Sequence, residues 1–194
     1  MMRKTIKEKD DNTNYVIGLI DGENALSPKI NDYPERSPYG IPANARGLEY
    51  FINAKKDNLV LGYKTKSYRD RKKGPKWKVL PKVSCKNHGI FAVFKVESGF
   101  GDIRSNKNWL KDYPNWDSDY PNTIFLSKPL FVLKEPILFK ELRELIPDSE
   151  YVNDYRRSVT RFLKKDAKKI FELMREKNPD KDKEINILIN MMSQ

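Results

Sequence analysis

Positive charges and aromatic rings are interleaved in one segment, residues 63–82. Nine lysines and arginines lie there against a single acidic residue, Asp70, so the segment carries +8 of the chain's formal net charge of +11. Tyr63, Tyr68 and Trp77 are spaced among these charges. A phosphate backbone attracts such a segment, whereas the alternative is a solvated lysine-rich loop. We expect phosphate contacts from Lys64, Lys66, Arg69, Arg71, Lys72, Lys73, Lys76 and Lys78.

Further aromatic residues lie in segments that we expect to be loops. A single loop ring is more often a satellite of the core. Several rings beside a basic patch could instead form a pocket that holds a flipped or single-stranded base by stacking. The rings in question are Tyr33 and Tyr39 in the first loop, Tyr68 and Trp77 in the basic segment, and Trp109, Trp116 and Tyr120 in the third.

The sequence offers no clear catalytic or metal-binding motif. It contains neither G-x-x-x-x-G-K-[ST] nor G-x-G-x-x-G, the glycine-rich patterns that cradle phosphates. Cys85 and His88 are the chain's whole supply of cysteine and histidine, too few for a zinc site. The acidic residues of 112–119 and 180–184 lie in stretches that we read as solvated. We therefore expect no cofactor, no metal and no catalysis from this domain.

Composition indicates a single folded domain. The 194 residues are 38% hydrophobic and 11% aromatic, and general disorder depletes aromatic residues. A single cysteine excludes an intrachain disulfide and favours a reducing compartment. No apolar run is long enough to span a bilayer, and the polar N-terminus does not look like a signal peptide. We expect a cytoplasmic protein with a polyanionic partner and no membrane contact.

Apolar patterning predicts a mixture of strands and helices. Residues 23–42 contain four prolines and are predicted to be a loop, after which Asn44 caps a helix with Leu48, Phe51 and Ile52 on one face. A short helix is expected within residues 136–146. The predicted strands are 15–20, 58–64 and 90–96, with one or two more in 123–133 around Pro129.

The clearest predicted helix is 161–175. Its apolar stripe is formed by Leu163, Ala167, Ile170, Phe171 and Met174, and lysines occupy the opposite face. Asn178 and Pro179 should stop this helix. We divide the chain into a flexible charged tail over 1–13, a domain over 14–177, and a connector or docked tail over 178–194.

The order of these elements resembles the EVE and YTH domains of the PUA-like superfamily. The resemblance rests on the strand YVIGLI, the loop ending YGIPANARGLEYF, the strands LVLGYK and GIFAVFKV, and the closing segments KEPILFKEL and SVTRFLKKDAKKIFEL. It covers about residues 14–177. The resemblance implies an α+β fold, with a PUA-like curved mixed sheet or open barrel flanked by helices.

The same resemblance implies a base pocket and its residues. Tyr39 falls near the position of the first pocket tryptophan of YTH domains, and Tyr68 or Trp77 would form the second wall. Asp21 or Asn24 would bond the base edge. This chain lacks tryptophan at the first position, and its loop over 64–88 is longer than in YTH domains.

Similar domains form the DNA-binding part of some McrB-type restriction proteins, joined to a GTP-hydrolysing motor. The expected function is capture of a modified base, with DNA favoured over RNA and a downstream GTPase motor as a possible partner. Two alternatives remain open. One is an RNA-binding module of the same superfamily, and the other is a small nuclease or RNA-processing hydrolase.

Overall fold

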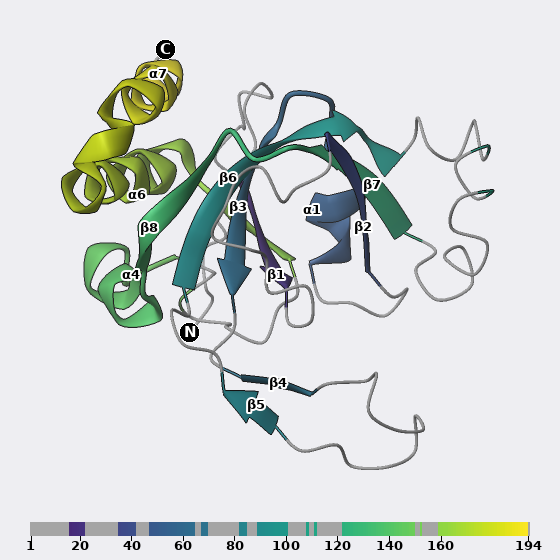
Figure 1. The fold of residues 1–194 in the computed structure, drawn as a ribbon, viewed down its shortest axis with the longest axis horizontal. Coiled ribbons are helices and arrows are strands. Elements are labelled where there is room, and N and C mark those ends of the chain that lie inside the picture. The colour runs from purple at the N-terminus through teal and green to yellow at the C-terminus, as the bar shows by residue number, and fades with distance from the viewer. Residues whose placement is uncertain are drawn as a thin grey trace, which may run out of the picture.

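The structure is a computed structural model that describes residues 16–21, 35–41, 47–64, 67–69, 82–84, 89–100, 108, 111, 122–149, 152 and 159–193. A seven-stranded sheet lies at its centre, and a separate two-stranded ribbon lies beside it (Figure 1). The main strands are β1 (Val16–Asp21), β2 (Arg36–Ile41), β3 (Leu59–Lys64), β6 (Gly89–Ser98), β7 (Asn122–Ser127), β8 (Phe131–Ile137) and β9 (Val159–Phe162). The ribbon pairs β4 (Ser67–Arg69) with β5 (Lys82–Ser84).

The sheet is mixed and mostly antiparallel. Its order is β2-β7-β6-β3-β1-β9, with β8 also paired to β6, and the pairing of β1 with β3 is parallel. The long strand β6 pairs with both β7 and β8, and the register of β6 shifts beside each of them. Such irregularities bend a strand and increase its twist. They accompany the curvature of the sheet seen in Figure 1.

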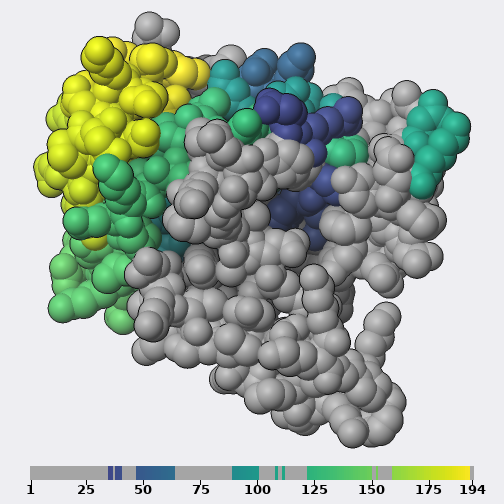
Figure 2. Space-filling view, viewed as in Figure 1, coloured from purple at the N-terminus to yellow at the C-terminus, as the bar shows by residue number. Residues whose placement is uncertain are grey.

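Three helices form a layer on one face of the sheet. They are α4 (Phe139–Leu145), α6 (Lys164–Lys177) and α7 (Asp182–Ser193), and the short turn η4 (Pro179–Lys181) joins the last two. Their buried side chains, including Leu142, Phe171 and Leu188, share one core with apolar residues of β3, β6 and β8. Figure 2 shows this helix layer as the yellow and green side of the molecule. None of the described helices is long and apolar enough to cross a membrane.

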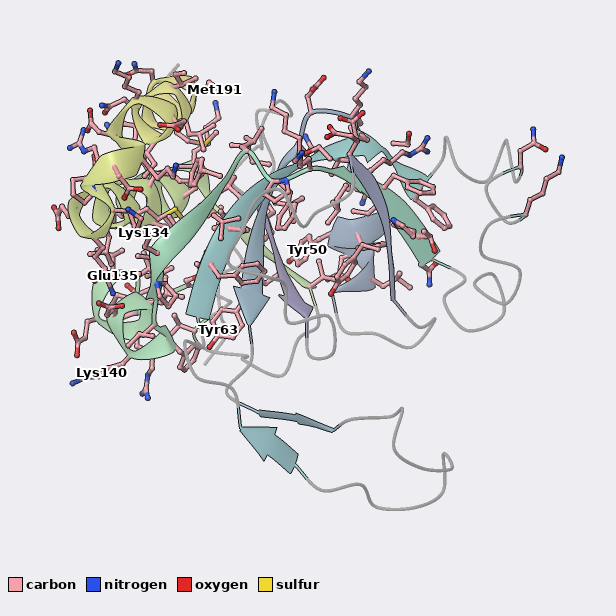
Figure 3. All side chains as sticks on the ribbon, in the orientation of Figure 1. Tyr50, Tyr63, Lys134, Glu135, Lys140 and Met191 are labelled. Atoms are coloured by element: carbon pink, nitrogen blue, oxygen red, sulfur yellow. The ribbon has the colours of Figure 1, made fainter. Side chains whose placement is uncertain are left out.

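On the opposite face, the residues that the structure describes form one short helix, α1 (Leu48–Ile52). This helix contacts both β9, at one edge of the sheet, and β7, next to the other edge. Phe51 is fully buried there in a second core with Val60, Phe94 and Ile124. The sheet therefore curls around α1 (Figure 1), and Tyr50 lies on this side in Figure 3.

The α+β fold confirms the expected fold class, and several local predictions were wrong. Strand β2 lies inside the predicted loop 23–42, since an edge strand tolerates Pro38, which lacks an N–H group. Helix α1 begins after Gly47, in a left-handed conformation, and not after Asn44. Residues 159–162 form β9, so α6 begins at Lys164, and Leu163 precedes the helix and is 38% exposed.

Candidate nucleic-acid interface

Two predicted site residues, Asp21 and Lys64, lie on neighbouring strands at one end of the sheet. Because β1 and β3 are parallel, both strands finish at this end, and the register pairs Asp21 with Lys64 as the last residue of each strand. The spacing along the sequence does not reveal this pairing. Only two residues separate Lys64 from the start of β4, so the β4–β5 ribbon follows directly from this end of the sheet. Figure 1 shows the ribbon apart from the main sheet, on the side toward which β1 and β3 run.

The register of the β4–β5 ribbon places like charges opposite each other. Arg69 is the partner of Lys82, and Tyr68 is the partner of Val83. Like charges directly opposite in an antiparallel pair are destabilising. The register therefore brings two basic residues of segment 63–82 to opposite positions on paired strands.

Tyr39, the predicted first wall of a base pocket, lies on β2 and is half-buried. Its ring packs against Phe51 of α1, with ring centroids 6.2 Å apart and an interplanar angle of 48°. It also borders the core that includes Ile124, its register partner on β7. Tyr39 is thus anchored between β2 and α1, which fixes the position of its ring.

Arg36, at the start of β2, was missed by the sequence analysis because its segment was predicted to be a loop. Its guanidinium carbon lies 3.7 Å from the centroid of the Phe125 ring, a cation–π arrangement. Its terminal nitrogen lies 3.5 Å from the Ser98 hydroxyl oxygen. Arg36 is exposed, so this contact orients a cation at the surface of the β2–β7 end of the sheet.

The remaining predicted site residues fall outside the described part of the chain. They are Trp77, Asn24, Lys66, Arg71, Lys72, Lys73, Lys76 and Lys78. The same holds for Cys85, His88 and the loop rings Tyr33, Trp109, Trp116 and Tyr120. Within the described ranges, no group of three or more His, Cys, Asp or Glu residues is placed to hold a metal ion.

Among the residues that the structure describes, the two carboxylates with shifted pKa values lie in the helix layer. At Asp166 burial raises the pKa, opposed by the charges of Lys165 and Lys169. At Glu141 burial alone would raise the pKa, but a hydrogen bond and charge from Lys177 and the backbone N–H of Leu138 lower it overall. We therefore assign these two carboxylates to the structural framework.

The curved sheet, flanked by helices and curled around α1, defines the class of this protein as an α+β domain built on a mixed, mostly antiparallel sheet. No protein-family model and no curated protein sequence matches the chain. Solved structures do match it. A hypothetical protein from Leishmania major is 13% identical, with a TM-score of 0.57, over 84% of this chain and 95% of that chain.

Two further structures extend this likeness. A Pseudomonas syringae protein is 12% identical, with a TM-score of 0.54, over 82% of this chain and 99% of that chain. Human THYN1, solved in complex with DNA containing 5-methylcytosine, is 10% identical, with a TM-score of 0.55, over 82% of this chain and 97% of that chain. At such identities the likeness shows a shared fold alone.

Proposed function

We propose that residues 14–177 form a nucleic-acid-binding domain that captures a modified base, flipped from DNA, in an aromatic pocket. The observation that carries this proposal is the register of β1 and β3. It places Asp21 beside Lys64 at one end of the sheet, and the β4–β5 ribbon follows from that end. The aromatic wall is Tyr39, with Trp77 or Tyr68 as the second wall. Phosphate contacts come from the basic segment, Lys64 to Lys78, and we extend them to Lys82, the register partner of Arg69.

The solved THYN1 structure supports this proposal, because a protein of the same fold was crystallised with methylcytosine-containing DNA. Affinity would come largely from contacts between cations and phosphates, which carry no sequence information. Preference for the modified base would come from the pocket. In a longer natural protein, such a domain would serve as the targeting part of a modification-dependent restriction system with a GTPase motor.

The phosphate part of the proposal is tested with the double variant Arg69→Gln/Lys82→Gln. Removing both cations should flatten the dependence of log affinity on log salt, by up to about 0.9 for each lost contact on duplex DNA. The matched control is Lys140→Gln/Lys183→Gln, which removes the same charge from exposed positions of the helix layer. An unchanged salt slope for the ribbon variant would mean that the ribbon does not touch the phosphate backbone.

The base pocket is tested with Tyr39→Ala and Trp77→Ala. Each stacking face contributes roughly 1–3 kcal/mol per base, whereas flipping a base costs a few kcal/mol. Losing one wall should therefore abolish the preference for a modified base and leave non-specific affinity within a few-fold. The measurements are the melting temperature and the ratio of affinities for modified and plain oligonucleotides.

A panel of methylated and unmodified adenine and cytosine oligonucleotides, as DNA and RNA, separates this function from its alternatives. Equal binding of plain RNA would favour an RNA-binding module. Metal-dependent cleavage of the oligonucleotides during incubation would favour a hydrolase. If both wall variants keep the full affinity ratio, the pocket lies elsewhere, and Trp116 and Tyr120 become the next candidates.

A further inference from the structure

The first half of α6 carries four lysines, Lys164, Lys165, Lys168 and Lys169, outside its set of buried residues. Lys164 and Lys168 are half-buried, and Lys165 and Lys169 are exposed. Since residues four apart share a helix face, the two pairs form one continuous basic strip along α6. The buried residues of the helix, Ala167, Ile170, Phe171 and Met174 among them, face the core of the helix layer.

The basic side chains in the two halves of α6 differ in whether they have polar partners. In the second half, Arg175 bonds to Asn186 at 2.8 Å, and Lys177 forms an ion pair with Glu141 at 2.7 Å. In the first half, none of the four lysines forms an ion pair with any residue that the structure describes. Asp166 is the one acid in this stretch, and its side chain is buried. Asp166 offsets part of the charge of Lys165 and Lys169, and the four lysines leave the strip with a net positive charge.

Helix stability explains Asp166, the acidic residue of the first turn, but not the neighbouring lysines. The helix dipole places partial positive charge at this end, so it favours acidic residues there and disfavours lysines. The residue before the helix, Leu163, provides no side-chain cap to compensate. Local rules that a sequence breaks without structural gain point to function. A bound polyanion would offset the mutual repulsion of the four ammonium groups.

We propose that the lysine strip of α6, Lys164, Lys165, Lys168 and Lys169, is a second phosphate-contact surface for the same nucleic acid. This inference rests on the proposed function. Strand β9 ends with Phe162 paired to Val16, the first residue of β1, whereas the ribbon follows the opposite end of β1 and β3. The strip and the ribbon thus belong to opposite ends of the sheet.

The separation of the two basic surfaces sets a length requirement. Strand β1 has six residues, and its ends are therefore about 17 Å apart. A ligand that contacts both surfaces has to extend over at least that distance, about five base pairs of duplex. The strip adds affinity for long nucleic acids and none for an oligonucleotide that fills only the base site.

The test compares Lys165→Gln/Lys169→Gln with the control Lys140→Gln/Lys183→Gln, which removes equal charge elsewhere in the helix layer. On a duplex of about 16 base pairs, the strip variant should bind several-fold more weakly, with a salt slope flatter by up to about 0.9 per lost contact. On an oligonucleotide of about four nucleotides, wild type and variant should bind alike. The melting temperature should be equal to or above that of the wild type.

The outcomes distinguish this inference from the proposed function. If the wild type fails to bind nucleic acid at low salt, the proposed function fails and this inference fails with it. If the wild type binds and the strip variant keeps the full salt slope on the long duplex, only this inference is overturned. A lower melting temperature with an unchanged slope would show a structural role. Loss of binding to phosphatidylserine vesicles alone would show that the strip contacts lipid, which also overturns it.

Discussion

The two faces of the main sheet are built in opposite ways. One face is covered by α4, α6 and α7, which contain most of the described helical residues. Their apolar side chains contribute to the larger of the two cores. Of the helices that the structure describes, the other face holds only α1, with Phe51 buried and Tyr39 and Tyr50 half-buried around it. The helix layer thus fixes the sheet, while the α1 side keeps aromatic rings near the surface.

The contacts that hold the two faces also differ in kind. In the helix layer, the buried amide of Asn178 accepts a hydrogen bond from the backbone N–H of Glu135 and donates one to its carbonyl oxygen, each at 3.0 Å. On the α1 side, Gly47 lies against the backbone of Val159 so closely that a Cβ atom would meet its carbonyl oxygen at 2.0 Å. A buried side-chain amide thus adds to the core of the helix layer, whereas a close backbone approach adds to the core on the α1 side.

The largest expected effect lies in the helix layer, with Phe171→Ala. Phe171 is fully buried, so its truncation should lower the free energy of unfolding by about 3–5 kcal/mol. Since the residue is remote from the α1 side, the folded variant should keep its preference for a modified base. Denaturant unfolding and binding of the same preparation measure both. The control is Leu173→Ala on the same helix, where a half-buried side chain should cost less.

The next effect lies on the α1 side, with Gly47→Ala. Gly47 has φ of +82°, and its Cβ would collide with Val159, so α1 has to move away from β9. A non-glycine residue in this conformation costs about 1–3 kcal/mol. Because α1 carries Phe51, against which Tyr39 packs, base preference should fall together with stability.

Ile52→Ala is the matched control for Gly47→Ala. Ile52 lies on the same helix and is 39% exposed, so its truncation should change stability by no more than about 0.5 kcal/mol. Full base preference in a destabilised Gly47 variant would break the comparison, because the α1 side would then be a core like the helix layer.

Elements with a strong local pattern could be predicted from the sequence. The strands β1, β3 and β6 and the stripe of Ala167, Ile170, Phe171 and Met174 were confirmed, since apolar runs and helical periodicity are local signals. Strand β2 was missed because proline normally indicates a loop. Proline is tolerated here because β2 is an edge strand, where a missing N–H group leaves no partner strand unpaired. The four residues of β9 were missed because their apolar pattern merges with that of α6.

The candidate site was less accessible to sequence reasoning. Composition identified a basic aromatic segment, but the pairing of Asp21 with Lys64 and of Arg69 with Lys82 depends on strand register. Register is set by contacts distant in sequence and by the faces that must be buried. The stacking of Arg36 on Phe125 likewise needs two strands to be adjacent, which no local pattern indicates.

A smaller effect is expected from Glu141→Gln, which tests the polar anchoring of the helix layer. Glu141 accepts hydrogen bonds from Lys177 at 2.7 Å and from the backbone N–H of Leu138 at 2.7 Å, and its pKa lies below the ordinary value of 4.5. A lowered pKa in the folded state means that the carboxylate stabilises the fold above its unfolded-state pKa. That contribution is lost as pH falls through the folded-state pKa.

At neutral pH, Glu141→Gln should therefore cost on the order of 1 kcal/mol, because the pair is only partly shielded from solvent. As pH falls below the unfolded-state pKa, the difference between wild type and variant should shrink toward zero. Denaturant unfolding at a series of pH values measures this convergence. A constant difference at every pH would assign the effect to packing and not to the charge.

The smallest expected effect concerns the contact between Arg36 and Phe125, which lies outside the helix layer. The guanidinium carbon of Arg36 is 3.7 Å from the centroid of the Phe125 ring. Cation–π contacts at exposed sites contribute about 0.5–1 kcal/mol. Because Phe125 is also buried, single variants mix this contact with loss of packing. A double-mutant cycle with Arg36→Gln and Phe125→Leu isolates the coupling. We expect a coupling energy of about 0.5 kcal/mol, and a value near zero would show that this end of the sheet gains no stability from its arginine.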